Sequence, residues 1–590
     1  MGGRKKQSLL NGALVLVIAT SFVEIVGLLY KIPLTNLIGT VGRGYTGTAY
    51  NIYIPIYNIS MAGLPVAISK LVSQSVAEGH FNDVKKIFKV AFRLFFATGV
   101  IGTIILLVLA YPYAKSIDSM ESLPSIIMIA PAVFVCCVMA TYRGYYSGLR
   151  NQTPSAISQM CEVVGKLVFG LGLAYAVQKY GLQCYEQGLA VFGVQCETRQ
   201  DAVMALAPYA AAASIFGVTM GAVCSLVFLM LRNKIVGDKI TQEELQSSPP
   251  AASGKKIAKT LITIAVPVVV STLVMNITNL IDSWSIQYRL QAAIDGNLSV
   301  IENMYSEALS LAGEMTSTQL KSYIYGAYEI ALDFRNLIPT ITTTLGLSAI
   351  PVLSEAWTLK NKLMIRSSIE SVIRVAMLIA LPSGIGIAIL SRQILNLVYG
   401  ASSSASISAT VMTLYGCFTF IMAAAQPLIN MLQGIGRADI PMKSVSIAAV
   451  VKVAVNFILV GIPGINIYGA IIGTFCFYAI TVSINLTSLI RVTGVKLNFK
   501  SVFFKPLFCS VLCGVAAWAF TGLLSNILPD FTINSRITTE TVSAVIGIVI
   551  AVIVYALALL FTRSIAADDV KMLPKGEKIC KILEKHGFIG

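Results

Sequence analysis

The sequence has little charge and almost no histidine. Charged residues make up only 12% of the 590 residues, and the two histidines, His80 and His586, lie in separate polar segments. A catalytic or metal-binding histidine cluster is therefore not expected. Hydrophobic residues reach 56%, which is more than a soluble core could hide from water. The composition excludes a soluble enzyme and indicates an integral membrane protein.

Positive charge exceeds negative charge by a formal +16. In a soluble chain this excess would suggest nucleic acid binding, but here Lys and Arg lie in short segments between apolar runs. The segments 85–89, 232–256 and 571–585 are basic, whereas the connections of opposite parity have few Lys or Arg. By the positive-inside rule we expect both termini in the cytoplasm and no nucleic acid partner.

Apolar runs of about 20 residues recur along nearly the whole chain. They predict an all-α polytopic membrane protein with about 14 transmembrane helices. The expected spans include 10–38, 46–76 and 324–357. No soluble catalytic domain is expected, because the apolar runs leave no room for one.

Changes in composition divide the chain into five predicted parts. The polar stretch QEELQSSPPAASGKK at 242–256 is rich in Pro, Ser and Gly, as expected of a linker between lobes. The predicted parts are an N-terminal six-helix lobe at 1–232, a cytoplasmic linker at 233–257, a C-terminal six-helix lobe at 258–492, an extra helix pair at 493–565 and a basic cytoplasmic tail at 566–590.

The two predicted lobes echo each other weakly in sequence. YSGLR at 146–150 precedes Lys166, and QGIGR at 433–437 precedes Lys452, at an offset of about 287 residues. Two six-helix lobes related by a parallel repeat are typical of transporters whose path runs between the lobes. We therefore expect alternating access by movement of one lobe against the other.

Two of the 11 cysteines, Cys184 and Cys196, share a polar loop. Since the charge pattern places this loop outside the cytoplasm, a disulfide between them is one expectation. Two free thiols are the alternative.

Several segments carry a resemblance to a known family. They are GLPVAISKL at 63–71, NLID at 279–282, AIPVLSE at 349–355 and LQGIGR at 432–437. With these motifs the chain resembles the multidrug, oligosaccharidyl-lipid and polysaccharide exporter superfamily, specifically its stage V sporulation protein B branch of polysaccharide and lipid II flippases. The resemblance covers nearly the whole chain.

The resemblance implies a substrate and a location. It implies a transporter in the plasma membrane of a bacterium that flips an undecaprenyl-linked oligosaccharide or a lipid II-like peptidoglycan precursor. Membrane lipids surround it, cell-wall synthases are candidate partners, and the monomer is the expected functional unit. No cofactor is expected, and H⁺ or Na⁺ is the candidate coupling ion.

Charged residues within the predicted spans form the candidate site, because a charge at the bilayer centre costs about 2.5 to 3.5 kcal/mol and needs a partner or a wet cavity. The candidate substrate ligands are Arg335, Arg289, Lys31, Arg43, Lys166 and Lys452. The candidate coupling or charge-balancing acids are Glu24, Asp282, Glu329 and Asp333. Arg335 and Arg289 lead, since a guanidinium can bind a diphosphate bidentately.

Each of these residues also has a structural interpretation. Lipid II flippases carry several Arg on their early spans, whereas this chain has Glu24 and Lys31 on one helix face, which can instead form an ion pair with another span that only fixes packing. Glu162 and Lys166 stand at i, i+4 and can neutralise each other on one helix. Arg43 follows the first span and is either a gate charge or an ordinary loop residue. The acids and arginines of the seventh and eighth spans can equally form a static salt-bridge cluster.

The extra helix pair can build a lipid-facing groove for an isoprenoid tail, as family members do. Its aromatic residues, which can instead form an interfacial belt, are Phe503, Phe504, Phe508, Trp518 and Phe520.

Two other functions compete with flipping. A cation-coupled multidrug exporter would share the fold, and the candidate cations and acids are too evenly balanced to separate it from a flippase. A polytopic glycosyltransferase or polysaccharide polymerase would place catalytic carboxylates in a large outer loop. The acids in 288–323 show no spacing of a paired acid and base, which argues against an enzyme.

Overall fold

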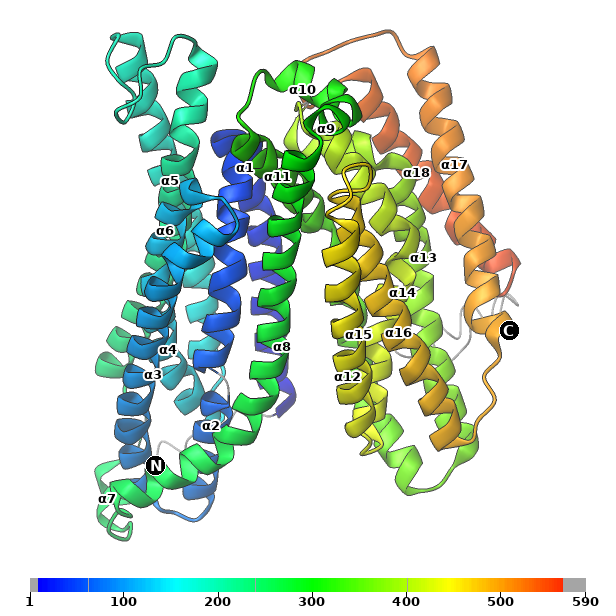
Figure 1. Cartoon of the computed structure of the whole chain (residues 1–590). Coiled ribbons are helices and arrows are strands. Elements are labelled where there is room, and N and C mark those ends of the chain that lie inside the picture. The colour runs from blue at the N-terminus through cyan, green and yellow to red at the C-terminus, as the bar shows by residue number, and fades with distance from the viewer. Residues whose placement is uncertain (1–8, 62, 239, 401, 566–590) are drawn as a thin grey trace. The chain divides into compact units, whose positions relative to one another are not determined.

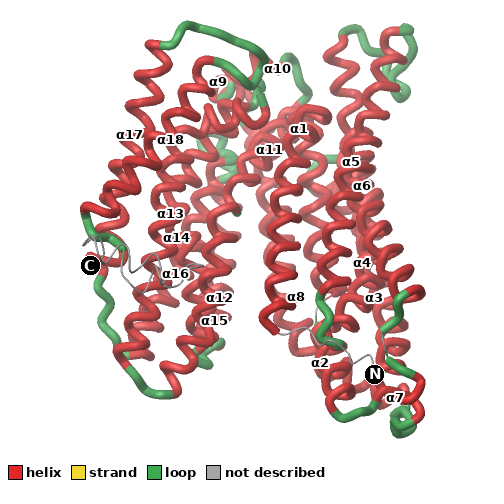
Figure 2. The backbone as a smooth tube through the Cα atoms, turned by 180° about the vertical axis from the view of Figure 1, so that it is seen from behind, coloured by secondary structure: helices red, strands yellow, loops and turns green. Residues whose placement is uncertain are grey.

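The computed structural model describes residues 9–61, 63–238, 240–400 and 402–565. Most of these residues lie in helices, and their β-structure consists of two isolated bridges, Val191–Val194 and Thr532–Thr538 (Figures 1 and 2). Helices satisfy every backbone hydrogen bond within one segment, as a bilayer requires. The predicted all-α membrane fold is confirmed.

Eleven helices in the described ranges are long and apolar enough to cross a membrane. This number treats Ile25–Ala77 as one candidate, where the sequence predicts two spans. The total of about 14 spans and the cytoplasmic termini remain predictions.

The chain folds into two compact units. Unit 1 contains Met1–Gln291 and Met315–Gly326, and unit 2 contains Ala292–Glu314 and Ala327–Gly590. The first division therefore comes after the polar linker, within a helix. The five parts defined from the sequence remain a prediction. The division into two units reflects which residues pack together, whereas the predicted lobes rest on a sequence repeat.

Unit 1 is a bundle of long helices. The helices wholly within it are α1 (Leu9–Met61), α2 (Leu64–Ala77), α3 (Phe81–Ser116), α4 (Leu123–Gly148), α5 (Thr153–Glu186), α6 (Arg199–Ile235) and the short α7 (Gln242–Gln246), with a 3₁₀ turn at Met120–Ser122. Most of α8 (Gly254–Gly296) and the first half of α11 (Ser317–Arg335) also belong to unit 1.

Two glycines interrupt the first helices of unit 1. Gly39 has φ 69° and kinks α1 without ending it. The one long helix therefore covers the first predicted span and part of the second. Gly63 has φ 74° and separates α1 from α2, with a proline in the first turn of α2. A left-handed φ favours glycine, and proline suits a first helical turn because that N–H has no helical partner. The GLP motif is therefore a helix break and not the interior of a span.

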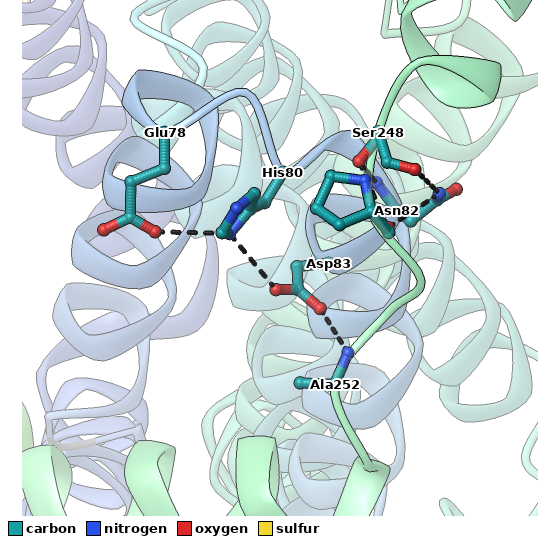
Figure 3. Close-up of polar contacts among 7 residues, drawn as sticks. Glu78, His80, Asn82, Asp83, Ser248 and Ala252 are labelled. Carbon is teal, nitrogen blue, oxygen red and sulfur yellow. Dashed lines mark hydrogen bonds and ion pairs between the residues drawn. The ribbon is translucent and has the colours of Figure 1, made fainter.

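The polar linker is bound to the beginning of α3 (Figure 3). The Asn82 backbone N–H donates to Ser248 Oγ at 3.1 Å, and its side-chain amide donates to three linker carbonyl oxygens. Asp83 Oδ1 accepts from the Ala252 N–H at 2.7 Å. His80 lies 3.3 Å from Glu78 and 3.9 Å from Asp83. These contacts make the linker an ordered part of unit 1.

Small residues bring the first half of α11 close to α1. A Cβ added to Gly326 would clash with the Thr40 carbonyl oxygen, and one added to Gly44 would clash with the Ser322 carbonyl oxygen. Small residues let membrane helices approach closely in this way. Lys321, which is 1% exposed, donates to the carbonyl oxygens that end α3. These contacts explain why α11 begins within unit 1.

Unit 2 contains the second half of α11 and all later helices. They are α12 (Leu337–Thr358), α13 (Lys362–Tyr399), α14 (Ala405–Gly434), α15 (Asp439–Leu459), α16 (Tyr468–Thr493), a π-helical turn (Lys500–Phe504), α17 (Lys505–Ile527) and α18 (Thr539–Phe561). Two short helices, α9 (Leu298–Met304) and α10 (Ser306–Ala312), cover one end of the unit. The Glu307–Arg392 ion pair at 2.6 Å ties α10 to α13.

The predicted span 324–357 is two helices and not one. The helix α11 ends at Arg335, and α12 begins at Leu337. Pro339 lies in the first turn of α12, where it cannot donate to the preceding helix. The break places Arg335 at a helix end.

Candidate functional site

Arg335 lies at the break between α11 and α12 against an aromatic ring. Its guanidinium carbon is 5.5 Å from the centroid of the Tyr415 ring on α14, a cation–π distance. Its Nε donates to Asn336 Oδ1 at 3.2 Å. The Tyr415 hydroxyl is 3.1 Å from the Tyr328 hydroxyl on α11. Two helices therefore hold one cation over one tyrosine.

Asn336 is also the residue that precedes the first turn of α12. It is the N-cap residue of α12, but its side chain makes no capping hydrogen bond. Because its amide oxygen accepts from Arg335 instead, it does not cover the first backbone N–H groups of α12. A helix N-terminus attracts anions through such N–H groups and the helix dipole, but the C-terminus of α11, whose dipole has the opposite sign, meets α12 at this residue. The positive charge of the break is therefore the guanidinium of Arg335.

The neighbouring acids on α11 have different surroundings. Asp333 Oδ2 accepts from the Tyr399 hydroxyl at 2.8 Å. Residues two apart do not share a helix face, so Asp333 and Arg335 point in different directions. Glu329 is half-buried on the same helix. The structure gives Asp333 a tyrosine partner from the end of α13, which the sequence did not predict.

The predicted set from the seventh and eighth spans is divided between the two units. Asp282 and Arg289 lie on α8 in unit 1, where Asp282 is 7% exposed and Arg289 is half-buried. Glu329, Asp333 and Arg335 lie in unit 2. Within unit 1, Asp282 and Arg289 are seven residues apart and share one helix face.

Three candidate cations lie near two tyrosines in unit 1. Lys166 Nζ is 5.0 Å from the ring centroid of Tyr30 and 5.3 Å from that of Tyr50. Tyr50 also interacts electrostatically with Lys31 and Arg43. Arg43 is buried within α1 after its kink, so the expectation of an ordinary loop position is wrong. The reason is that α1 continues past Gly39, whereas the apolar pattern ends a span there.

Glu162 has a different partner from the one its spacing predicts. Its Oε2 accepts from Arg143 Nη2 at 2.8 Å, and Arg143 also donates to Ser158 and Ser225. The pairing of Glu162 with Lys166 is therefore replaced by a pair between α5 and α4. Arg143, which as a cation near a span end would only anchor topology, is the centre of a polar cluster between three helices.

The remaining candidates are described only in part. Lys452 is half-buried on α15, one turn before the fully buried Asn456. Glu24 lies on α1, and its side chain is outside the described part of the structure. Cys184 and Cys196 are both free cysteines, so the structure has the two thiols rather than the disulfide.

An apolar pocket lies between α13, α17 and α18. Its volume is about 320 Å³, and its lining includes Pro382, Leu390, Cys513, Ala517, Ile548 and Tyr555. It shares no lining residue with the Arg335 cluster. Among the predicted aromatic residues, Phe504, Phe508 and Trp518 are exposed and do not line this pocket. The extra helix pair thus forms an apolar pocket with α13 through small and aliphatic side chains.

Sequence reasoning missed the aromatic partners of the cations. Tyr415 and Tyr30 stand in apolar segments where an aromatic residue is common, and nothing local marks them as neighbours of Arg335 and Lys166. From the sequence, Arg143 is expected only to anchor a span end, and Lys321 is not among the candidates. Lys321 stands among polar residues at the start of α11, and this position in the sequence gives no sign that its side chain is buried.

Long apolar helices with charged side chains buried among them define a multi-pass membrane protein. Residues 9–191 match the Polysaccharide biosynthesis protein family, and residues 299–458 match the MatE family. The chain is 25% identical to the Lipid II flippase MurJ of Bacillus subtilis (strain 168) over 79% of each chain. It is 23% identical to Stage V sporulation protein B of the same organism over 96% of this chain and 98% of the relative.

A solved structure agrees with these sequence relatives. The Lipid II flippase MurJ in an inward closed conformation superposes with a TM-score of 0.58 at 14% identity, covering 93% of this chain and 99% of that one. The chain is thus homologous to these two proteins and has the fold of the lipid II flippase structure. The resemblance seen in the motifs is confirmed, as is a multi-pass location in the bacterial plasma membrane. One of these relatives is named a lipid II flippase and not an enzyme, in agreement with the expected transport protein.

Proposed function

We propose that this protein flips an undecaprenyl-linked oligosaccharide or a lipid II-like peptidoglycan precursor across the plasma membrane by alternating access between two lobes. The observation that carries this proposal is Arg335 at the α11–α12 break. A guanidinium suits a diphosphate, because it can bind bidentately to a group that carries about two negative charges. The homology to a lipid II flippase supports the same substrate class.

The cation–π contact suits a substrate that must be released. Tyr415 stabilises the guanidinium by about 0.5 to 2 kcal/mol when the site is empty. A charge-assisted hydrogen bond to an anion contributes about 1.5 to 3 kcal/mol. The gain on binding is therefore modest, and the substrate can leave on the other side. Asp333 accepts a hydrogen bond from Tyr399. It lies on a different face of α11 from Arg335, so it is not placed to compete with the substrate for the guanidinium.

The other charged groups have supporting roles in this proposal. The cations that would guide the diphosphate are Arg289, Lys31, Arg43, Lys166 and Lys452. The acids that would balance charge or couple transport to H⁺ or Na⁺ are Glu24, Asp282, Glu329 and Asp333. The apolar pocket between α13, α17 and α18 suits part of the isoprenoid tail. Cell-wall synthases are candidate partners. One chain contains every residue named here, which supports the monomer as the functional unit.

The test is leaflet exchange of a fluorescent undecaprenyl-diphosphate sugar in liposomes, read with a membrane-impermeant quencher. We expect protein-dependent exchange by the native chain and at least about a tenfold loss in Arg335→Gln, since about 1.4 kcal/mol corresponds to tenfold. Arg491→Gln, an exposed guanidinium at the end of α16, is the matched control and should exchange normally. Normal exchange by well-folded Arg335→Gln would disprove the role of Arg335.

A cation-coupled multidrug exporter is the second candidate function. The match of residues 299–458 to the MatE family favours it. Arg335 argues against it, because a fixed guanidinium repels organic cations. Efflux of an organic cation driven by a H⁺ or Na⁺ gradient, with no exchange of the lipid-linked sugar, would support this function instead.

A further inference from the structure

A second pocket continues from the apolar pocket of unit 2 toward the end of α17. Its volume is about 190 Å³, and we call it the polar vestibule; its polar lining residues are Gln393, Thr521, Ser525 and Glu540. Leu390 lines both pockets, and the consecutive residues Ala517 and Trp518 line one each. The two pockets therefore adjoin along α13 and α17, which pack on each other and on α18.

The polar vestibule offers hydrogen-bond acceptors and one negative charge. Glu540 lies exposed in the first turn of α18. Ser525 Oγ donates to the Gly522 carbonyl oxygen at 2.9 Å, which leaves its own lone pairs to accept. Thr521 is 6% exposed, and its hydroxyl lies against Gly547 of α18, so Glu540, Ser525 and Gln393 are the polar groups that a ligand can reach.

The charge of the vestibule selects the ligand. No Lys or Arg is among the described residues that line it. A phosphate or carboxylate would meet the Glu540 carboxylate with no cation to offset the repulsion. A primary ammonium has three N–H donors, which match the carboxylate and the hydroxyl oxygens. The vestibule therefore suits an ammonium group.

The surface around the two pockets indicates which kind of molecule supplies the ammonium group. The helices α17 and α18 are candidate membrane spans. Their outward side chains are exposed, including Trp518 at 69% and Val552 at 59%, and both of these residues also line the pockets. The pockets thus open on the surface that apolar residues present to lipid. The vestibule is at the end of α17 that the charge pattern predicts to face outside.

We propose that the two adjoining pockets bind a membrane lipid whose headgroup carries a primary ammonium. The ammonium contacts Glu540 and Ser525 in the vestibule, and one acyl chain fills the apolar pocket. Binding of this lipid does not depend on the proposed transport activity. The apolar pocket is common to both proposals, and a substrate tail and an acyl chain cannot fill it at the same time.

The experiment measures which lipids stay on the whole protein. The purified chain is equilibrated in vesicles of equal parts phosphatidylethanolamine, phosphatidylcholine and phosphatidylglycerol, extracted with mild detergent, and its retained lipids are counted by native mass spectrometry. We expect about 1.5- to fivefold more phosphatidylethanolamine than phosphatidylcholine, the range that an exposed ion pair gives. Phosphatidylcholine is the informative comparison because its ammonium has no N–H donor.

Three variants test the assignment. Glu540→Gln and Ser525→Ala should each reduce the preference toward equal retention. Glu540→Lys should turn the preference toward phosphatidylglycerol. Glu314→Gln removes an exposed carboxylate elsewhere in unit 2 and should retain lipids as the native chain does. Equal retention by the native chain, or an unchanged preference in monodisperse Glu540→Gln, would overturn the proposal, whatever the outcome of the flipping assay.

Discussion

Replacing Glu162 with Gln should destabilise unit 1 by about 2 kcal/mol. The Glu162 and Arg143 side chains are 32% and 19% exposed, and their oxygen and nitrogen are 2.8 Å apart. Removing one partner of a fully buried pair costs about 3 to 5 kcal/mol, and an exposed pair contributes about 0 to 1 kcal/mol. The partial exposure of Glu162 places this pair between those limits. The change corresponds to about 30-fold in the unfolding equilibrium constant.

The measurement is the free energy of unfolding in mixed micelles, with two double-mutant cycles. Glu162→Gln combined with Arg143→Gln should show coupling of about 1 to 2 kcal/mol, because the two residues are in contact. The same change combined with Lys166→Gln should show little coupling. Asp439→Asn is the matched control, since the Arg437–Asp439 pair has both side chains 46% exposed. If Glu162→Gln costs no more than Asp439→Asn, or couples more strongly to Lys166, the assignment of the partner is incorrect.

Three further predictions concern single contacts. Lys321→Met should destabilise the chain by about 1 to 3 kcal/mol, read by thermal unfolding, because two carbonyl oxygens at the end of α3 lose a buried donor. The pKa of Asp238 lies below its usual range, because hydrogen bonds from Lys85 at 2.6 Å and from a tyrosine outweigh the effect of burial, which would raise it. Its stabilisation is therefore present above about pH 4, the unfolded value, and is lost as pH falls through the lower folded pKa. The protection of the amides at 236–238 and 240–241, relative to their intrinsic exchange rate at each pH, should decrease over that range in the native chain and already be low at neutral pH in Asp238→Asn; equal protection at neutral pH would contradict this. Gly326→Ala should lower the yield of folded protein by forcing α11 away from α1, whereas Gly172→Ala, which meets nothing within 4 Å, should be tolerated; equal yields would show that the close approach is unnecessary.

The apolar pattern predicted most of the helices but not their interruptions. Runs of about 20 apolar residues identify spans because the bilayer itself sets that length. The pattern does not register Gly63 or Pro339 as breaks, since glycine and proline are also tolerated inside membrane helices. The two helix breaks at these residues became visible only once the backbone was placed.

The candidate site was predicted by residue type and not by arrangement. A charge inside a span is costly, which marked Arg335, Lys166 and Asp333 from the sequence. Their aromatic partners Tyr415 and Tyr399 come from other helices, and no local spacing relates them. Glu162 shows the opposite error, because a favourable i, i+4 spacing to Lys166 lost to a contact with Arg143 on α4.

The sequence by itself determined the membrane class, the helical content, the relatives and the list of charged residues that need a partner. These properties follow from composition and from short motifs, which act residue by residue along the chain. Tertiary structure alone decided which partner each charge has, where α11 passes from unit 1 to unit 2, and that Glu540 adjoins an apolar pocket. The physical reason is that ion pairs, cation–π contacts and pockets depend on distances of a few ångströms between helices that are far apart in sequence.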